Sequence, residues 1–399
     1  MANTNLEKML LIAPYASGLE EPTSYPPLGL LYVASNLPAV CDIDVHIMES
    51  EEFDKFGYDS YGISIHSVGV YKSAMQLATK IHKVNPRAEI MVGGSGAALV
   101  KQTSWLTKIE GEAEPYFEKD ISDIDLINFP ARHLVDDRFI VNTSVHHTGS
   151  RATTMIATRG CPYRCSFCDR TTLGTTFRKR SIENISKEAQ YLIARYGIEF
   201  IRFVDDCITI DKKWFAELCM ELKTLGLKWT VLSRADRIDP KLLKLMKKCG
   251  CQEIFFGFES GSDKILKLMQ KKITVAQNIK AVEMCKDAGI VCCAYMMFGF
   301  PGEDEKSVAD TIAFLEYANP NKSRITQFVP IPQSDVWINR ENYGIRVKRN
   351  YQDYWCFDRH DFGLHYDYID EDVMYGLRDT IFDYYEKKYK QSWKKVLTQ

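Results

Sequence analysis

The segment Arg159-Gly160-Cys161-Pro162-Tyr163-Arg164-Cys165-Ser166-Phe167-Cys168 places three thiols within eight residues. It follows a β-branched run at 154–158, and a helical pattern begins at 182. A loop between a strand and a helix can wrap three thiolates around one face of an iron–sulfur cluster. Because no fourth cysteine lies nearby in the sequence, one iron would keep an open position for a substrate or cosubstrate. The spacing therefore predicts a catalytic cluster on Cys161, Cys165 and Cys168.

A zinc knot or an electron-transfer cluster is the alternative interpretation of these cysteines. Zinc sites usually combine Cys-x-x-Cys pairs with a fourth Cys or His at knuckle spacing. The histidines close by, His146 and His147, precede the strand instead of following the cysteines. The spacing therefore favours the open cluster over zinc.

From residue 152 to 330, β-branched or aromatic runs alternate with amphipathic helical stretches, and the alternation repeats six times. The predicted strands are 154–158, 200–204, 228–232, 253–258, 291–298 and 325–329. The predicted helices are 182–196, 213–225, 240–248, 263–269 with 275–288, and 305–318. Right-handed crossovers would curl these parallel strands into a (β/α)6 partial TIM barrel, with its chemistry at the C-terminal strand ends.

The first 115 residues repeat this alternation on a smaller scale. The predicted strands are 8–13, 44–48, 61–66 and 89–92, with helices near 28–36 and 70–84. This pattern predicts an α/β, doubly wound (Rossmann-like) domain with a ligand crevice at its strand carboxyl ends.

The rest of the chain completes the predicted organisation. We expect an N-terminal domain at 1–115, a linker at 116–150, a barrel at 151–330 and a C-terminal aromatic tail and helix at 331–399. The aromatic tail from Tyr351 to Tyr368 is a candidate lid, or a hydrophobic cap over the barrel mouth. A final helix is predicted from about 370 to 391.

Composition narrows the class of protein. The formal charge is −2, from 51 basic and 53 acidic residues, so nucleic-acid binding is not indicated. No apolar stretch is long enough for a signal peptide or a membrane span, which predicts a cytoplasmic protein. In the cytosol twelve cysteines are not expected to form disulfides. Nine of them are interpreted as small buried hydrophobes: Cys41, Cys207, Cys219, Cys249, Cys251, Cys285, Cys292, Cys293 and Cys356.

The cysteine pattern Cys-x-x-x-Cys-x-x-Cys, with the aromatic Phe167 before the last cysteine, resembles the signature of the radical S-adenosylmethionine (SAM) superfamily. The resemblance covers residues 152–330. It implies a 4Fe–4S cluster that binds SAM through its unique iron and accepts an electron from a reductant such as flavodoxin or ferredoxin. SAM is then cleaved to a 5′-deoxyadenosyl radical. Phe167 would lie beside these cofactors.

The same resemblance implies SAM contacts at successive strand ends. Asp205 and Asp206 end the second strand, where the family contacts the amino group of SAM. Arg234 ends the third strand, where a basic side chain can face the carboxylate. Glu259 or Ser260 ends the fourth strand and would reach the ribose.

The fifth strand ends in Met297-Phe298-Gly299-Phe300-Pro301-Gly302-Glu303, which resembles the apolar wall and turn beside the adenine, with Phe298 in the wall. These residues also have structural alternatives. Asp205 or Asp206 could be a helix N-cap, and Arg234 could pair with Asp236 or Asp239 at the surface. Their shared place at one end of successive strands favours SAM binding.

Landmarks of the N-terminal domain resemble the cobalamin-binding-type domain that precedes many radical SAM barrels. They include Tyr25, before Pro26-Pro27, and the pair Gly93 and Gly94. The chain lacks an Asp-x-His-x-x-Gly loop that would supply a histidine to cobalt. His66, at a strand end, is the candidate to approach cobalt, and a core or cap role is favoured for it. The connections 48–61 and 94–110 are short, so the helices that flank the corrin look shortened.

The sequence thus predicts a radical SAM transferase that performs cobalamin-dependent C-methylation. The first alternative is a cobalamin-independent radical SAM enzyme with a vestigial N-terminal domain, catalysing hydrogen abstraction with rearrangement, dehydration or coupling. A non-catalytic iron–sulfur redox protein is the second. The substrate, a small molecule or a peptide, and the residue that handles its hydrogen atoms are not predicted, because specificity residues lie on variable loops.

Overall fold

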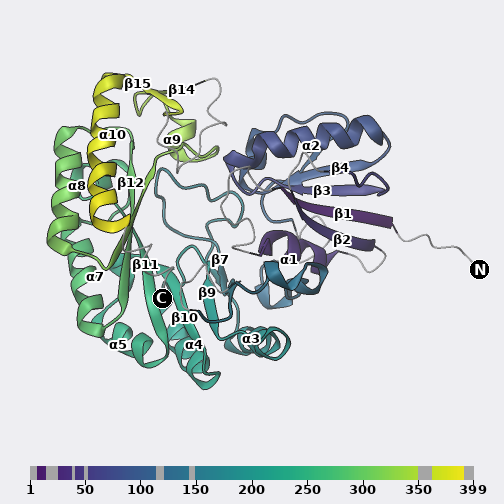
Figure 1. Cartoon of the computed structure of the whole chain (residues 1–399), viewed down its shortest axis with the longest axis horizontal. Coiled ribbons are helices and arrows are strands. Elements are labelled where there is room, and N and C mark those ends of the chain that lie inside the picture. Colours follow the sequence, from purple (N-terminus) through teal and green to yellow (C-terminus); the bar gives the residue numbers. More distant parts are fainter. Residues whose placement is uncertain are drawn as a thin grey trace, which may run out of the picture.

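The computed structural model describes residues 7–14, 26–37, 41–48, 53–113, 121–142, 149–348 and 362–390. Two parallel sheets organise the chain: a five-stranded sheet in the order β2-β1-β3-β4-β5 and a six-stranded sheet in the order β13-β12-β11-β10-β9-β6. Figure 1 shows the first sheet at the right and the second, curled inside an arc of helices, at the left. These sheets confirm the predicted fold class, and the domain boundaries at 115, 150 and 330 stay predictions.

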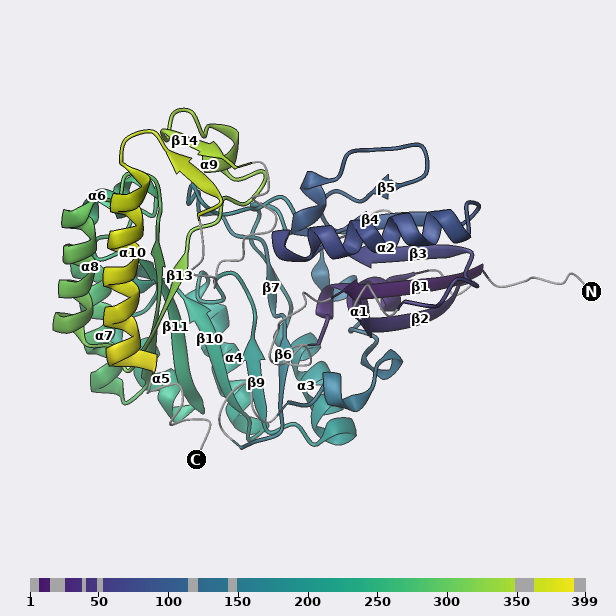
Figure 2. The ribbon, with the colours of Figure 1, turned by 45° about the horizontal axis from the view of Figure 1, so that its top comes forward.

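In the N-terminal sheet the chain adds strands first to one side of β1 and then to the other, so the strand order reverses between β1 and β3. Such a reversal is the topological switch point of a doubly wound fold. Its elements are β1 Glu7–Pro14, α1 Leu28–Asn36, β2 Cys41–Met48, β3 Ser60–Ser64, α2 Tyr71–Val84, β4 Glu89–Gly93 and β5 Thr107–Lys108. Figure 2 shows α1 and α2 on opposite faces. Alternation along β1 sends Leu10 and Ile12 to the core under α2, and Met9 and Leu11 to the core shared with the barrel.

The barrel is a sheet of parallel strands with helices on its outer face (Figure 2). Its strands are β6 Ala152–Met155, β9 Phe200–Phe203, β10 Lys228–Ser233, β11 Cys251–Glu259, β12 Val291–Phe298 and β13 Lys322–Gln327. Its helices are α3 Ile182–Tyr196, α4 Lys212–Thr224, α5 Pro240–Lys248, α6 Asp263–Leu268, α7 Val275–Ala288 and α8 Glu305–Ala318. Since β6 and β13 are the edges among the described strands, the barrel is partial.

The helix bounds follow from local capping. The side chains of Ser181, Thr274 and Asp304 accept backbone N–H bonds at the starts of α3, α7 and α8. Gly197 and Gly289 end α3 and α7 in the left-handed conformation. The predicted bounds of α3, α5, α7 and α8 are therefore confirmed.

The first predicted barrel strand, 154–158, is wrong in its extent. The barrel strand β6 ends at Met155, and β7 (Thr158–Arg159) pairs antiparallel with β8 (Arg178–Lys179). The backbone turns because Asp205 Oδ1 accepts a bond from Ala157 N at 3.0 Å and another from Thr158 N. Consequently the loop that contains the three cysteines connects β7 and β8 and does not directly follow the barrel strand. We call β7, β8 and this loop the cysteine hairpin.

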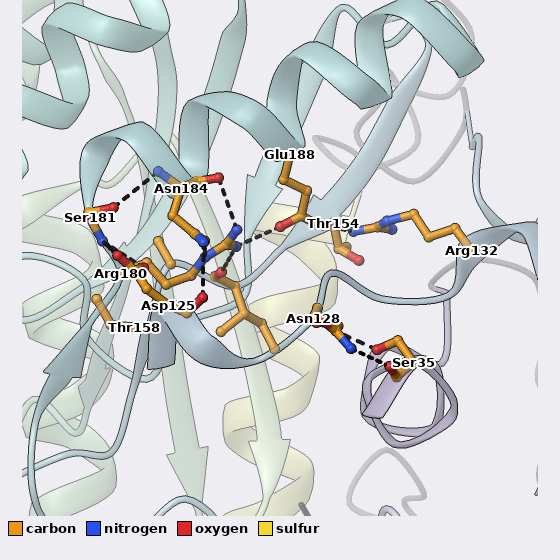
Figure 3. Close-up of polar contacts among 12 residues, drawn as sticks. Ser35, Asp125, Asn128, Arg132, Thr154, Thr158, Arg180, Ser181, Asn184 and Glu188 are labelled. Carbon is orange, nitrogen blue, oxygen red and sulfur yellow. Dashed lines mark hydrogen bonds and ion pairs between the residues drawn. The ribbon is translucent and has the colours of Figure 1, made fainter. Parts of the chain in front are cut away.

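The described part of the predicted linker, 121–142, contains three short 3₁₀ turns: Ile124–Leu126, Arg132–Leu134 and Asp137–Phe139. Figure 3 shows Asn128 beside Ser35 of α1, with Asn128 Nδ2 donating to Ser35 O at 2.7 Å. The same view shows Arg132 and Arg180 meeting the Glu188 carboxylate of α3, at 3.1 and 2.6 Å. This buried ion network ties the linker to the barrel.

The C-terminal region adds α9 Asp335–Ile338, β14 Ile345–Val347, β15 Leu364–Tyr366, α10 Glu371–Tyr385 and a π turn at Glu386–Lys390. Most of the candidate lid, residues 351–361, lies outside the described residues. The part that is described packs against the turn after β12, where Tyr366 Oη donates to Gly299 O at 2.6 Å. Within the described ranges, every helix is too short or too polar to span a bilayer.

Candidate functional site

Cys161, Cys165 and Cys168 line one cavity of about 530 Å³ at the C-terminal ends of the barrel strands. The cysteine loop folds back on itself, since Cys161 N donates to Gly174 O at 3.2 Å. Gly160 has φ +84°, and a Cβ there would lie 2.2 Å from Thr176 O. Only glycine can therefore occupy the position before the first cysteine.

The chemistry of these donors fits a cluster. Burial, with a contribution from Asp206, raises the pKa of Cys168 to about 12, so iron must displace the thiol proton when it binds. Arg234 Nη1 lies 3.8 Å from Cys165 Sγ and supplies positive charge beside a thiolate. In the described ranges no three acidic, His or Cys side chains converge on one point suited to a single ion. A 4Fe–4S cluster instead receives each thiolate on a different iron, which suits more widely spaced donors.

Asp205 and Asp206 both line the cavity but differ in role. Asp205 is buried, and its Oδ1 also accepts from Thr158 Oγ1 at 2.6 Å. Burial raises the pKa of Asp205 to about 7. Asp206 is exposed to the cavity, and Asp211 is the residue that caps α4. Asp205 therefore shapes the cysteine hairpin, and Asp206 is the carboxylate placed to meet a ligand.

Arg234 is buried in the cavity wall, not at the surface. Its guanidinium lies 3.7 Å from the centroid of the Tyr163 ring. Its Nε is 3.0 Å from Asp236 Oδ1, so the predicted pairing with Asp236 is present. A third bond runs from Nη2 to Lys271 O at 2.8 Å. Arg234 thus fixes the cysteine loop and still presents positive charge to the cavity.

Lys271 is a cavity residue that sequence reasoning missed. Its Nζ donates to Glu259 Oε1 at 2.8 Å and lies 5.6 Å from the centroid of the Phe167 ring. Burial alone would lower the pKa of Lys271, but the Glu259 carboxylate raises it. Lys271 lies in the loop between α6 and α7 and not at the end of a strand, so the pattern of polar residues at strand ends did not indicate it.

Of the remaining predicted contacts, Phe167 and Glu259 line the cavity, whereas Ser260 and Phe298 are not among the described residues that do. Ser260 is buried, and its Oγ accepts from Ser262 N at 3.1 Å. The ring of Phe298 packs on that of Phe362, with centroids 6.0 Å apart. Of the two residues predicted to reach the ribose, Glu259 is therefore favoured over Ser260.

The predicted adenine turn is braced from two sides. Gly299 N donates to Glu303 Oε2 at 2.6 Å inside the turn. Burial raises the pKa of Glu303 to about 8. Tyr366 of β15 holds the Gly299 carbonyl from outside. The conformation of the turn is thus stabilised by Glu303 within it and by Tyr366 of β15.

A second pocket, of about 180 Å³, lies between the N-terminal sheet and the cysteine hairpin. Apolar side chains of β1, α1, β4 and the barrel line much of it, together with Gly93 and Gly94. Gly94 has φ +97°, and a Cβ there would lie 2.8 Å from Ile65 O, so this position requires glycine. His66 is not among the described residues that line this pocket, and Tyr25 lies outside the described residues.

Glu112 joins the two sites. Its carboxylate pairs with Arg159 of β7 at 2.5 Å and with Arg178 of β8. The Arg159 guanidinium also lies 4.9 Å from the centroid of the Tyr32 ring of α1. Glu112, Arg159 and Tyr32 all line the second pocket. A ligand in this pocket would therefore touch residues bonded to the base of the cysteine loop.

Residues 155–315 match a family model described as the Radical SAM superfamily. An uncharacterised methyltransferase of Pyrococcus horikoshii is 26% identical, over 88% of this chain and 86% of that protein. An anaerobic magnesium-protoporphyrin IX monomethyl ester cyclase of Rubrivivax gelatinosus is 25% identical, over 83% of this chain and 69% of the cyclase. The bacteriochlorophyllide d C-12(1)-methyltransferase of Chlorobaculum tepidum is 28% identical, over 72% of this chain and 68% of that methyltransferase.

Two solved structures share the architecture. The methyltransferase TsrM from Kitasatospora setae, with cobalamin and a [4Fe-4S] cluster bound, has a TM-score of 0.63 at 16% identity, covering 86% of this chain and 79% of TsrM. The cobalamin-dependent radical enzyme OxsB, with aqua-cobalamin and SAM bound, has a TM-score of 0.60 at 18% identity, covering 85% of this chain and 56% of OxsB. At these identities the matches show a common fold for the N-terminal sheet and the barrel.

Proposed function

This chain is a radical SAM enzyme, and we propose that it methylates a carbon atom in a cobalamin-dependent reaction. The enzyme class rests on the superfamily match and on three cysteines that line one cavity. The observation that carries the methyl-transfer part is the apolar pocket between the N-terminal sheet and the cysteine hairpin. This pocket lies at the switch point of a doubly wound sheet, which is the place where such folds bind their ligands.

The residues of the larger cavity would divide the work of holding the cofactors. When bound, the cluster and SAM supply reductive cleavage, and cobalamin supplies a methyl carrier. Cys161, Cys165 and Cys168 would hold the cluster. Asp206 and the pair of Glu259 and Lys271 would receive the polar groups of SAM. A small cytosolic reductant such as flavodoxin or ferredoxin would deliver the electron.

The smaller pocket supports cobalamin through its lining and its neighbours. TsrM and OxsB, which share this fold, bind cobalamin. The pocket is below the roughly 300–1,000 Å³ of a typical ligand site, so it could admit only part of a cobalamin. Because His66 is not in its lining, we expect binding by burial of apolar surface without a protein histidine on cobalt.

A cobalamin-independent radical reaction is the second candidate. Residues 53–59, the described part of the connection between β2 and β3, contain no helix, so that wall of a corrin site is short. One similar protein is named as a cyclase and not as a methyltransferase. In this case the N-terminal domain would serve as a cover.

The deciding experiment is anaerobic reconstitution with iron, sulfide and hydroxocobalamin, followed by desalting. Retained corrin absorption, with a cobalt(II) paramagnetic resonance spectrum lacking nitrogen splitting, supports the proposal. Ala113 lines the smaller pocket, so Ala113→Trp should abolish corrin retention and leave the cluster absorption intact. The matched control is Ala313→Trp on the exposed face of α8, which should retain corrin.

Products separate the remaining classes. S-adenosylhomocysteine indicates methyl transfer from SAM, and 5′-deoxyadenosine indicates radical cleavage. Wild-type protein without corrin that still forms 5′-deoxyadenosine would favour the second candidate. Protein that holds a cluster but forms neither product would favour a redox protein.

A further inference from the structure

The Arg234 guanidinium bonds directly to one cysteine of the triad, a contact that neither of its predicted roles includes. Its Nη1 donates to Cys165 Sγ at 3.8 Å. The Arg234 side chain is only 6% exposed, and a buried charge interacts more strongly with its neighbours than a charge in water does. A cation thus touches one of the predicted cluster ligands from inside the protein.

Three other contacts fix the orientation of this guanidinium. Its Nε and Nη2 donate to the Asp236 carboxylate at 3.0 and 3.5 Å, and Nη2 also donates to Lys271 O at 2.8 Å. The Tyr163 ring covers one face, with its centroid 3.7 Å from Arg234 Cζ. Because a guanidinium holds its donors in a rigid planar fork, these partners direct Nη1 toward Cys165. The Asp236 carboxylate meets the opposite edge and leaves Nη1 to the sulfur.

The carbonyl that receives Nη2 belongs to an unusual segment of backbone. Gln270 and Lys272, on either side of Lys271, have φ angles of +52° and +53°, a region that residues other than glycine adopt uncommonly. The cysteine loop holds this segment, since Ser166 N donates to Met269 O at 2.9 Å. Such backbone persists where its surroundings determine it, and it is frequent at functional sites. The guanidinium and the cysteine loop are therefore positioned by the same segment.

A second cation lies near the same cysteine. Burial alone would lower the pKa of Lys271, but the Glu259 carboxylate and, after it, Cys165 raise it. Lys271 Nζ pairs with Glu259 Oε1 at 2.8 Å, so this carboxylate offsets much of its charge. Among the described side-chain contacts, the bond to sulfur belongs to Arg234. We therefore expect the larger effect on the triad from Arg234.

One carboxylate acts on the triad in the opposite sense. Burial raises the pKa of Cys168 most, and Asp206 contributes next, so a negative charge lies near that thiol. Asp206 is exposed to the cavity, where solvent and salt weaken its field, whereas Arg234 is buried. The buried guanidinium should therefore outweigh the exposed carboxylate.

We propose that Arg234, through its N–H···S bond to Cys165, raises the reduction potential of the iron–sulfur cluster. The reductant gives up one electron, and that electron adds one negative charge to the cluster and its three thiolates. Hydrogen bonds to the sulfurs and the charge around a cluster set its reduction potential, and the buried cation stabilises the added charge. Arg234 acts through Cys165, so it is a positioning residue. The inference deepens the radical SAM part of the proposed function and does not depend on cobalamin.

The test is an anaerobic redox titration of the full-length reconstituted protein without SAM. The paramagnetic resonance signal of the reduced cluster reports the midpoint potential. Arg234→Gln should disfavour reduction at least about tenfold, which is a shift of about 59 mV to more negative potential for one electron. Arg234→Lys keeps the charge without the planar fork, so its shift should be smaller. Asp236→Asn removes the carboxylate that offsets the guanidinium and should shift the potential in the positive direction.

Arg237→Gln is the matched control. Arg237 also pairs with Asp236, at 3.7 Å, and lies 5.4 Å from the centroid of the Tyr163 ring, but none of its described contacts is to a cysteine. This variant should change the potential much less than Arg234→Gln does. An unchanged potential in Arg234→Gln would overturn the inference. Shifts of the same sign in Arg234→Gln and Asp236→Asn would also overturn it, because damage to the structure does not follow the sign of the charge removed.

Iron content and corrin retention are measured on the same samples. If Arg234→Gln binds no iron, Arg234→Lys and Asp236→Asn decide the inference by the direction of their shifts. A wild type that binds no iron would overturn both the inference and the proposed function. A wild type that binds iron without corrin would remove only cobalamin from the proposed function, and the potentials would still decide the role of Arg234.

Discussion

The Glu112 carboxylate lies 2.5 Å from the Arg159 guanidinium, two residues before the first cysteine of the triad. Glu112 follows the last strand of the N-terminal sheet, and it also pairs with Arg178 on the other side of the hairpin. The N-terminal domain is thus bonded to both strands that carry the cysteine loop. A ligand in the smaller pocket between them would contact Glu112 and Arg159.

We expect Glu112→Gln to destabilise the protein by about 3–5 kcal/mol, because it leaves two largely buried guanidiniums without their carboxylate. Denaturant unfolding of the apo protein measures this change. Glu110→Gln is the control, since Glu110 is 70% exposed in its pair with Lys108 and such pairs contribute about 0–1 kcal/mol. Equal losses of stability in the two variants would show that the pairing of Glu112 with Arg159 and Arg178 contributes no more than an exposed ion pair.

Alanine at Cys161, Cys165 or Cys168 should each abolish iron binding, because three thiolates leave no spare ligand. Iron analysis and the visible absorption of the reconstituted protein test this, with about four irons expected in the wild type. Cys249→Ala and Cys251→Ala are the controls, as both residues are buried and neither is among the described residues that line the cavity. If this pair proved necessary for iron and the triad dispensable, the site assignment would be wrong.

Glu259→Gln and Lys271→Met should leave the cluster intact and weaken SAM binding. Each removes one partner of a buried ion pair that faces the cavity. The expected loss is on the order of 1.5–3 kcal/mol, and the same is expected for Arg234→Ala. Equilibrium binding of SAM measures it. The neighbouring Lys272 is exposed, so Lys272→Met should not change the affinity, and unchanged affinity in every variant would place SAM elsewhere.

Stability should fall with rising pH because of Glu303. Burial raises the pKa of Glu303 to about 8, whereas glutamate in an unfolded chain titrates near about 4.3. The folded state therefore keeps a proton that the unfolded state releases. This contribution is fully present below about pH 4.3 and is lost toward pH 8, at about 1.4 kcal/mol per pH unit.

Urea unfolding of the apo protein between pH 5 and 8 measures this slope. Glu303→Gln should reduce this slope, because glutamine does not titrate, and leave the part due to Asp205, whose pKa burial raises to about 7. Glu305→Gln, at the exposed start of α8, should keep the wild-type slope. A wild-type slope in Glu303→Gln would mean that other groups control the dependence on pH.

The elements that the sequence predicted well are those decided by local interactions. Helices α3, α5, α7 and α8 begin and end where predicted, because periodicity, N-caps and left-handed glycines act within one or two turns of the chain. It was also predictable that the three cysteines lie together, since all of them belong to one short loop. Alternation along β11 from Glu253 could further have favoured Glu259 over Ser260 for the cavity.

Contacts between distant residues were decided only by the tertiary structure. Asp205 ends the first barrel strand early by accepting bonds from a segment 47 and 48 residues away. Arg202 and Tyr295 meet across 93 residues, and Lys271 enters the cavity from a loop between helices. Local patterns cannot predict such pairs, because the partner of a buried charge is chosen by packing and desolvation in the folded chain. The sequence alone predicted the cofactor chemistry, and the tertiary fold determined which side chains line the cavity together with the three cysteines.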